Sequence, residues 1–431
     1  MFHFGIITVR RHKIHVIIGN SAAGLSAIRA LRRMGDSGTI LLVSAEDCNA
    51  YSPVLTTYYI AGQIRRSDMF MVDDGFYKVF DVQRLFGRRA VGIDPEKRLV
   101  HLDNRSNLPY DNLLIASGAS AIPLKNVDTD ALEFVSTLRT IRDADKIEKA
   151  TEKAREIVFI GAGLVSLQII KAILGKEKKL TLVVGSYQIL SQQMDSEGAA
   201  IIQEKLEAQG ISILFGRRVE RIDRKGDRVH VLTNFNEVLT ADLVVVGKGV
   251  KPNLNMVENT EIKMRDGILV DDQMRTNLED VFASGDVAEG KNTITGQMEV
   301  IATWSNACAQ GEIAGMNMAG CPAKRKGQFR ENVTTILETS VVSIGLSRPE
   351  EGEFKVLSHV DVKHGVYRKL FLDGSILVGA LLLGKIDDAG VIRHCIANRL
   401  DVSPWQDEIA TGLLDFGNIL INSNDYSWPI N

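Results

Sequence analysis

The feature that most constrains this chain is a strand, a glycine-rich turn and a helix in immediate succession near its start. The apolar run IHVII at 14–18 leads into GNSAAG at 19–24. Apolar residues at helical spacing follow, and then a further strand at 39–43. This order is the βαβ context in which a glycine-rich turn binds a dinucleotide. Taken alone, the motif is weak, because many glycine-rich turns bind nothing.

The same succession occurs a second time in the middle of the chain. The run IVFI at 157–160 enters GAGLVS at 161–166, a helix extends to 174, and a strand follows at 180–184. Two such units form an internal repeat, which is far more specific than either copy. The repeat predicts an α/β protein with two Rossmann-like dinucleotide-binding domains.

Beyond a linker-like stretch near residue 325 the pattern changes, and a third unit of α+β type is predicted. Its strands are expected at 341–346, 354–359, 367–371 and 376–383, and its helices near 387–398 and 404–414. The length of 431 residues agrees with about three domains.

The composition argues against several classes of protein. The net charge of −3 gives no basic excess for nucleic acid, and the longest uncharged stretch, 48–64, is too short and too polar to span a membrane. The four cysteines form no C-x-x-C pair and no cluster with histidines, which argues against zinc, cysteine-ligated iron–sulfur clusters and a disulfide framework. We therefore expect no metal site and a cytoplasmic location, with residues 1–13 as an untargeted extension.

The first glycine turn contains the residue types that a pyrophosphate site needs. Gly19 permits the tight turn, Ser21 lets the backbone approach a pyrophosphate, and Gly24 lets the helix pack close to the strand. The amides at the start of the helix then face an anion. An acidic group for a ribose hydroxyl is expected about 20 residues further on. Glu46 lies near that position, although the spacing falls closer to Ser44, and a solvated loop carboxylate is the alternative.

Five motifs in fixed order resemble those of the FAD-dependent pyridine nucleotide-disulfide oxidoreductase superfamily. They are GNSAAG at 19–24, LLIASGA at 113–119, GAGLVS at 161–166, VKPN at 250–253 and ASGD at 283–286. The resemblance covers about residues 14–325, and the last unit is similar to the C-terminal interface domain of that superfamily. The domains that it implies are a FAD domain in two parts (1–125 and 256–325), an NAD(H) domain with its connecting segment (126–255) and an interface domain (326–431).

The same resemblance implies which residues bind the two cofactors. Asp286 would contact the ribityl chain of FAD, and Trp304, at the start of a helical pattern, would lie at the pyrimidine end of the flavin. The residues implied for FAD are Gly19, Ser21, Ala22, Ala23, Gly24, Glu46, Ala90, Ser117, Gly118, Gly285, Asp286 and Trp304. Those implied for NAD(H) are Gly161, Gly163, Leu164, Val165 and Gly249.

One departure from the superfamily pattern removes a nucleophile. Many members carry a redox cysteine shortly after the second strand, and aligning YSPVLT at 51–56 with that segment puts Val54 in the cysteine position. Without a thiolate there, disulfide reduction and cysteine-sulfenate peroxidase chemistry lose their mechanism. The chain is therefore similar to the cysteine-free branch, which includes NAD(P)H reductases of rubredoxin and ferredoxin and the flavin part of nitrite reductases.

A second departure concerns a Lys–Glu pair that this branch often has beside the flavin. In the same register the two positions are Thr57 and Gln168, so both partners are neutral. Their joint change is chemically consistent, because a buried carboxylate without its cation is costly. We predict that the two side chains lie close together beside the flavin. No side chain is predicted to be catalytic, since the reaction is centred on the flavin.

The second glycine motif is imperfect. Ser166 takes the place of the third glycine. The strand at 180–184 ends in VVGS, with no carboxylate for a ribose diol, and no arginine for a 2′-phosphate occurs before Arg217. We expect that NAD(H) binding is retained through weaker or different contacts, with NADH preferred to NADPH. A domain retained only for architecture is the alternative.

The predicted function is an electron-transfer flavoprotein subunit that moves electrons between NAD(H) and an iron–sulfur partner, since a flavin interconverts two-electron and one-electron chemistry. The chain resembles the flavin subunits of multisubunit iron–sulfur oxidoreductases, such as phenylglyoxylate dehydrogenase and tungsten aldehyde oxidoreductases. An oligomer or hetero-complex formed through the C-terminal domain is expected. Two alternatives stay open: a stand-alone NADH oxidase that uses dioxygen, and a non-catalytic flavin-containing scaffold subunit with a degraded NAD site.

Overall fold

The structure, a computed structural model, describes residues 12–175, 177–325, 327–350, 352–415, 417 and 419. Most of the predicted N-terminal extension and the segment 420–431 lie outside the described residues. Contacts divide the chain into two compact units, each made of three separate stretches. Unit 1 consists of 1–52, 66–120 and 251–328, and unit 2 of 53–65, 121–250 and 329–431. No helix in the described part of the chain is long and apolar enough to cross a membrane.

Unit 1 is built on a five-stranded parallel sheet with the strand order β19-β7-β1-β2-β3. The strands are β1 (Ile14–Ile18), β2 (Thr39–Ser44), β3 (Val82–Phe86), β7 (Asn112–Ile115) and β19 (Val281–Ala283). The most buried of these strands are nearly continuous apolar runs, which is typical of a parallel sheet covered on both faces. Because β1 lies between β2 and β7, the strand order reverses there, and ligands bind at the carboxyl ends of strands at such a point.

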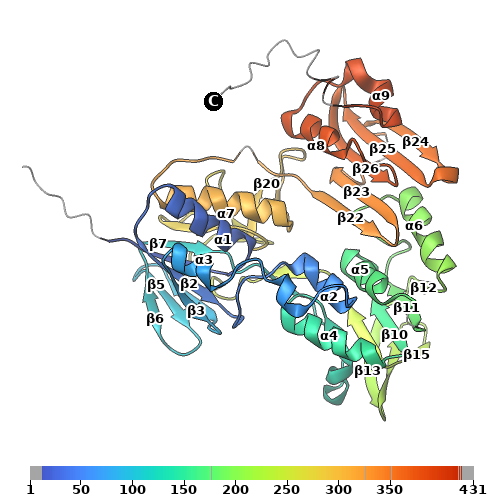
Figure 1. The fold of residues 1–431 in the computed structure, drawn as a ribbon, viewed down its shortest axis with the longest axis horizontal. Coiled ribbons are helices and arrows are strands. Elements are labelled where there is room, and N and C mark those ends of the chain that lie inside the picture. Colours follow the sequence, from blue (N-terminus) through green and yellow to red (C-terminus); the bar gives the residue numbers. More distant parts are fainter. Residues whose placement is uncertain are drawn as a thin grey trace, which may run out of the picture. The chain divides into compact units, whose positions relative to one another are not determined.

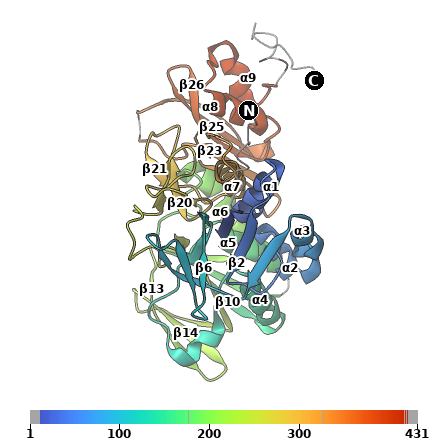
Figure 2. The same ribbon diagram turned by 90° about the vertical axis from the view of Figure 1, so that its left-hand side faces the viewer.

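Two helices of unit 1, α1 (Ala22–Arg33) and α7 (Trp304–Met318), pack against each other (Figure 1). They stay side by side in the second view (Figure 2). Glycines make this approach possible: a Cβ atom on Gly311 would lie 2.1 Å from the carbonyl oxygen of Ala23, and one on Gly315 would lie 2.5 Å from that of Ala27. Because α1 follows the first glycine turn directly, α7 fixes the position of that turn.

The other elements of unit 1 are small. A three-stranded antiparallel sheet contains β4 (Ala90–Asp94), β5 (Leu99–Leu102) and β6 (Asn107–Pro109). A second three-stranded sheet contains β18 (Ile268–Leu269), β20 (Ala288–Lys291) and β21 (Met298–Val300). Helix α3 (Asp74–Val79) begins at Asp73, whose carboxylate accepts from the amide of Phe76. β8 (Ala119–Ala121) and β17 (Val250–Pro252) form a two-stranded sheet, and the boundaries of unit 1 fall within these two strands.

A buried histidine in β1 links the stability of unit 1 to pH. His15 is fully buried, with Nε2 3.0 Å from Asp36 Oδ1 and Nδ1 3.3 Å from the Asn112 amide nitrogen. The neutral tautomer with its proton on Nε2 satisfies both contacts, because Nε2 donates to the carboxylate and Nδ1 accepts from the amide. Burial lowers the pKa of His15 below 6.5, although Asp36 acts in the opposite direction.

We expect His15 to make the free energy of unfolding fall as the pH drops below about 6.5, by up to about 1.4 kcal/mol per pH unit. The unfolded imidazole takes up a proton more readily than the folded one, so its stabilising contribution is complete above the unfolded pKa and is lost in acid. Urea denaturation between pH 7.5 and 5.5 measures this slope. The variant His15→Gln should show a shallower slope, and equal slopes for the two proteins would contradict the assignment.

Unit 2 contains a second five-stranded parallel sheet, with the strand order β12-β11-β10-β16-β9. The strands are β9 (Val135–Thr137), β10 (Glu156–Ile160), β11 (Lys179–Val184), β12 (Ser212–Phe215) and β16 (Leu243–Val246). A three-stranded antiparallel sheet contains β13 (Val219–Lys225), β14 (Arg228–Thr233) and β15 (Val238–Ala241). The helices are α2 (Thr56–Ile60), α4 (Ile141–Lys153), α5 (Leu164–Ile173) and α6 (Ser196–Ala208), and α2 packs against α4 and α5.

The C-terminal part of unit 2 is an antiparallel sheet with the order β22-β23-β26-β25-β24 and two short helices. Its elements are β22 (Glu331–Ile336), β23 (Thr339–Gly345), β24 (Lys355–Asp361), β25 (Val366–Asp373), β26 (Ile376–Leu383), α8 (Ala389–Asn398) and α9 (Gln406–Thr411). Strand β22 was not predicted, because its alternation of polar and partly buried residues is weak. Helix α9 is shorter than predicted, since Pro404 lies in a preceding 3₁₀ turn and Gly412, at φ 75°, ends the helix.

A polar cluster joins this C-terminal sheet to α6. The Tyr367 hydroxyl donates to Asp195 Oδ2 at 2.6 Å, and the Lys369 ammonium lies 2.7 Å from the same oxygen. Asp195 also caps α6, because its other carboxylate oxygen accepts from the amide of Gly198. Burial and the neighbouring carboxylate both raise the pKa of Tyr367. These contacts help to explain why the strand-rich C-terminal part and the second parallel sheet form one compact unit.

Candidate functional site

The carboxyl ends of four neighbouring strands in unit 1 meet along one edge of the sheet. Ile18 lies beside Val43 and Ile115, and Ile115 lies beside Ala283. Backbone hydrogen bonds of 2.8 to 3.0 Å extend this ladder by one residue at the ends of β1, β7 and β19. Most residues predicted for FAD follow these strands directly: Gly19, Ser21, Ala22, Ala23, Gly24, Glu46, Ser117, Gly118, Gly285 and Asp286. Residues far apart in sequence are thereby brought to one edge.

The first glycine turn has no room for side chains at two positions. A Cβ atom on Gly19, at φ 126°, would lie 2.0 Å from the carbonyl oxygen of Ala116, and one on Gly24 would lie 2.0 Å from that of Gly19. Ser21 occupies the N-cap of α1, yet its side chain makes no capping hydrogen bond and the first turn contains no acidic residue. The amides at the start of α1 are therefore left for an anion, as in other phosphate-binding turns.

A tyrosine side chain stabilises the first glycine turn through hydrogen bonds. The Tyr77 hydroxyl donates to the side-chain oxygen of Asn20 at 3.0 Å and accepts from the amide of Ala50 at 3.1 Å. The Asn20 amide group donates to the carbonyl of Cys48 at 3.2 Å. Sequence reasoning missed Asn20 and Tyr77, because their partners lie 27 to 57 residues away in the chain.

Glu46 lies two residues beyond β2, at the same edge as Gly19, and is partly buried. Both of its carboxylate oxygens lie within 3.1 Å of the Tyr51 hydroxyl. A carboxylate held in this way at the end of the second strand is placed to accept hydrogen bonds from a ribose. Ser44, the other candidate from spacing, is buried and its hydroxyl donates to the carbonyl of Glu46.

The turn after β7 is held by an asparagine from a distant segment. The Asn253 side-chain amide donates to the carbonyl of Ser117 at 2.8 Å, and its backbone amide donates to that of Gly118 at 3.0 Å. The Ser117 hydroxyl in turn donates to the Asn253 carbonyl at 3.2 Å. These reciprocal hydrogen bonds join Asn253 of the VKPN motif to the turn at the end of the 113–119 motif, which explains why the two motifs occur together.

The turn after β19 is supported from α7. The Gly285 amide donates to Gln310 Oε1 at 2.7 Å, and the buried Gln310 side chain donates to that of Gln328. Two buried hydroxyls remain: within the described residues neither Ser284 Oγ nor Thr303 Oγ1 has a hydrogen-bond partner. Buried polar atoms are usually paired, so these oxygens point to a polar ligand. Asp286 follows Gly285, and Trp304, 36% exposed, begins α7.

Ala90 begins β4, four residues after the end of β3, and is buried. It is the predicted FAD residue that comes from the small antiparallel sheet. Together, the close backbone contacts at Gly19 and Gly24, the uncapped start of α1 and the two unpaired hydroxyls fit FAD along this edge.

The second parallel sheet repeats this arrangement in unit 2. Gly161 follows β10 at φ 98°, and a Cβ atom there would lie 2.4 Å from the carbonyl oxygen of Gly247, just beyond β16. Gly163 is the N-cap of α5 and therefore offers no capping side chain, while Leu164 and Val165 form the first turn. Gly249, at φ 93°, follows the end of β16. All five residues predicted for NAD(H) thus lie at the carboxyl ends of β10 and β16.

Comparison with protein-family models gives two matches. Residues 13–311 match the family described as pyridine nucleotide-disulphide oxidoreductase, which is well over half of the chain. The chain belongs to this family. Residues 332–400 match the rubredoxin NAD⁺ reductase C-terminal domain. An oxidoreductase with FAD and NAD(H) as cofactors was predicted, and family membership confirms it.

Known relatives cover between 71% and 95% of this chain. It is 30% identical over 417 residues to the epsilon subunit of NADH-dependent phenylglyoxylate dehydrogenase from Aromatoleum evansii, covering 95% of this chain and 98% of that one. It is 28% identical over 309 residues to rubredoxin-NAD⁺ reductase from Pseudomonas putida, covering 71% and 80%. A chain of the covalent putidaredoxin reductase–putidaredoxin complex matches with a TM-score of 0.85 at 22% identity, covering 93% and 99%. This likeness confirms the predicted fold class.

The serine in the third glycine position of the NAD(H) motif is accommodated by a glycine just beyond β16. Ser166 is fully buried, and a Cβ atom on Gly247 would lie 2.2 Å from Ser166 Oγ. The Ser166 hydroxyl therefore occupies the space that a side chain at residue 247 would need, and the glycine leaves that space free. Helix α5 can still lie close to the sheet, so the departure from the family motif does not by itself disable the turn.

The residue that the predicted register places in the redox-cysteine position is a valine. Val54 lies in a 3₁₀ turn and is 63% exposed. None of the four cysteines is in a disulfide. Within the described residues no group of three or more His, Cys, Asp or Glu side chains could hold a metal ion.

Thr57 and Gln168 both lie in unit 2, on the packed helices α2 and α5. Their side chains have other hydrogen bonds. The Thr57 hydroxyl donates to the Val54 carbonyl at 3.3 Å, and the Gln168 amide donates to Thr334 Oγ1 at 2.6 Å and to the Thr335 carbonyl. Their proximity beside the flavin stays a prediction. Gln168 also ties α5 to β22, a contact that sequence reasoning missed.

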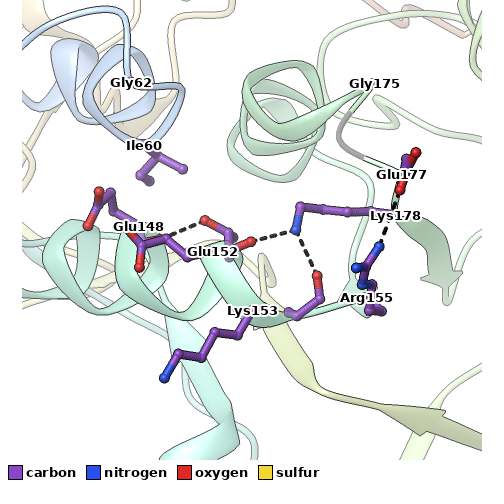
Figure 3. A pocket seen from close by; sticks show the side chains of 11 residues that line it. Ile60, Gly62, Glu148, Glu152, Lys153, Arg155, Gly175, Glu177 and Lys178 are labelled. Carbon is purple, nitrogen blue, oxygen red and sulfur yellow. Dashed lines mark hydrogen bonds and ion pairs between the residues drawn. The ribbon is translucent and has the colours of Figure 1, made fainter.

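Unit 2 contains a pocket of about 750 Å³ (Figure 3). None of its lining residues belongs to the glycine turn at 161–166. Its lining includes the end of α2, the last turns of α4 and the segment before β11. The Lys178 ammonium donates to the carbonyls of Thr151 and Ala154 and so caps α4. Arg155 and Lys178 directly precede β10 and β11, so this pocket lies at the amino ends of those strands, opposite to Gly161.

Proposed function

We propose that this family member is an electron-transfer flavoprotein subunit that moves electrons between NAD(H) and an iron–sulfur partner protein or subunit. The observation that carries the proposal is the relationship to the epsilon subunit of NADH-dependent phenylglyoxylate dehydrogenase, which extends over nearly the full length of both chains. The C-terminal match adds support, because that domain is named for rubredoxin NAD⁺ reductase.

FAD, when bound, supplies a centre that exchanges two electrons with a nicotinamide and single electrons with an iron–sulfur partner. Two reduced one-electron centres together give up two electrons, and NAD⁺ takes these two electrons and one proton to become NADH. The chain's own residues would position the cofactors: the turn at 19–24, Glu46 and Asp286 along the first sheet edge, and the turn at 161–166 along the second. Val54 leaves no thiolate that could carry the electrons instead.

The deciding experiment is an anaerobic titration of the purified protein with NADH, followed by addition of an oxidised rubredoxin or ferredoxin. We expect a flavin absorption band that NADH bleaches, and its return as two equivalents of the one-electron acceptor are reduced. A protein without flavin, or a flavin that NADH leaves oxidised, would contradict the proposal. Fast NADH consumption in air without an added iron–sulfur protein would favour an oxidase instead.

A matched glycine variant tests whether NADH binds at the second turn. Gly163 has φ −85° and no atom within 4 Å of a built Cβ, so Gly163→Ala should fold and retain FAD. If a pyrophosphate approaches this backbone, the added methyl group should weaken NADH binding about tenfold or more. Gly390→Ala, in α8 and also without a close neighbour, is the control and should bind NADH normally. Unchanged NADH affinity in Gly163→Ala would show that NADH does not bind at this turn.

A further inference from the structure

The edge of the second sheet where an adenosine ribose would lie contains an arginine instead of a carboxylate. Strand β11 ends at Val184 and is followed by Gly185, Ser186 and Tyr187, none of which is acidic. In dinucleotide sites a carboxylate at this position accepts hydrogen bonds from the ribose diol and repels a 2′-phosphate, whereas an arginine accommodates that phosphate. What replaces the carboxylate therefore bears on which nucleotide is accepted.

Strand pairing brings residues from β12 to this edge. Val184 pairs with Phe215, the Arg217 amide donates to the Val184 carbonyl at 3.1 Å, and the Gly216 amide donates to that of Ser186 at 3.1 Å. The two segments after β11 and β12 thus run side by side, although they are about thirty residues apart in the sequence.

The two arginines of the second segment differ in their surroundings. The Arg217 guanidinium makes a two-point ion pair with Glu237, at 2.9 and 3.2 Å, and stacks on the Phe235 ring at 4.0 Å. Its charge is therefore already neutralised. The exposed Arg218 side chain has its Cγ 3.8 Å from the position of a Cβ on Gly185, and within the described residues its guanidinium has no hydrogen bond or ion pair.

An aromatic ring completes this edge. Tyr187 is 89% exposed, the highest value among the large apolar side chains that are described as exposed. A Cβ atom on Gly216, which has φ 66°, would lie 3.3 Å from the Tyr187 Cε1 atom. The glycine therefore leaves room for the ring. A flat, exposed ring and a guanidinium on the two neighbouring segments of one sheet edge are suited to a purine that carries a phosphate on its ribose.

We infer that Arg218 receives the adenosine 2′-phosphate of NADPH and that Tyr187 stacks on the adenine, so that this domain binds NADPH at least as tightly as NADH. The inference rests on the proposed function, because it requires that the domain binds a nicotinamide dinucleotide. It differs from the preference for NADH expected from the sequence, because counting along β11 alone does not bring Arg218 to that edge.

Adenosine fragments test the inference without flavin chemistry. Calorimetric titration of the FAD-loaded full chain with 2′,5′-ADP and with 5′-AMP should show that the 2′-phosphate strengthens binding. In Arg218→Ala, we expect 2′,5′-ADP to bind about tenfold or more weakly and 5′-AMP to bind as before, because a charge-assisted bidentate contact is lost. In Tyr187→Ala, the binding of 2′,5′-ADP and of 5′-AMP should weaken equally, because both fragments contain the adenine that stacks on the ring. Arg155→Ala, which removes an exposed arginine at the opposite edge of the sheet, is the matched control.

The outcomes separate this inference from the proposed function. Tighter binding of 5′-AMP than of 2′,5′-ADP to the unaltered protein, or equal losses of both fragments in Arg218→Ala, would overturn the inference. If NADH still bleaches the flavin in that case, the proposed function stands. If neither fragment binds and NADH leaves the flavin oxidised, both fail together.

Discussion

Replacing Gly311 by alanine should yield protein that purifies with little or no FAD. The new methyl carbon would lie 2.1 Å from the carbonyl oxygen of Ala23 and 2.7 Å from its Cα, so the obstacle is backbone and cannot rotate away. Helix α7 would have to move off α1, and overpacking of this kind costs about 1–3 kcal/mol or more. Because Ala23 lies within the first glycine turn, the displacement falls directly on the predicted pyrophosphate site.

The measurement is the ratio of flavin to protein absorbance after purification, together with the thermal unfolding midpoint. Gly390→Ala is the control, since it adds the same methyl group to helix α8, where no atom lies within 4 Å. Removing a helical glycine there should be neutral or stabilising by about 0.5–1 kcal/mol. Full flavin content in Gly311→Ala would show that α7 does not position the turn.

Replacing Asp388 by alanine should destabilise the C-terminal part of unit 2 by about 3–5 kcal/mol. Asp388 and Arg368 are both buried and form a two-point ion pair, with nitrogen–oxygen distances of 3.0 and 2.6 Å. Arg368 also donates to the carbonyl of Ile409 in α9 at 2.9 Å. Without its carboxylate the guanidinium would remain buried and uncompensated, and removing one partner of such a pair costs far more than removing both.

The double variant Arg368→Met with Asp388→Leu separates the charge effect from packing. It should recover most of the lost free energy of unfolding, because two apolar side chains replace two buried charges, although the Ile409 carbonyl then loses a donor worth about 1 kcal/mol. Chemical denaturation of the three proteins measures the differences. A loss of less than about 1 kcal/mol in Asp388→Ala would contradict a stabilising role of this pair.

The turns at the carboxyl ends of β1, β7 and β19 could be located from the sequence because their signal is local, and the binding of FAD by their residues stays a prediction. Gly19 and Gly24 are required by close contacts inside one turn, and such contacts leave a fixed spacing in the sequence. The supports of that edge were not predictable. Tyr77, Asn253 and Gln310 act through partners 25 to 136 residues away, and no short pattern records which polar side chain will meet which backbone group.

In unit 2 as well, the sequence reveals the local features at the carboxyl ends of the strands, whereas the contacts between distant segments appear only in the structure. The sequence shows that the strand ending at Val184 lacks a carboxylate, but it does not show what takes its place. Pairing of β11 with β12 brings Arg218 to Gly185, and a glycine at 247 makes room for Ser166. The first relation joins the segments that follow two neighbouring strands, and the second joins helix α5 to the segment after β16, so both depend on how the strands and the helix pack.

By itself, the sequence of this protein determined two glycine turns of the type that binds dinucleotides, the family, the cofactors and the absence of a cysteine at residue 54. These follow from backbone conformations that only glycine or small residues adopt, and from residue types that are present or missing. Only the tertiary structure decided which side chains hold each turn, that Arg218 lies near Gly185 at the end of β11, and that the C-terminal sheet joins the second parallel sheet in one compact unit. Those features arise from contacts between distant segments, which exist only once the strands have paired and the helices have packed.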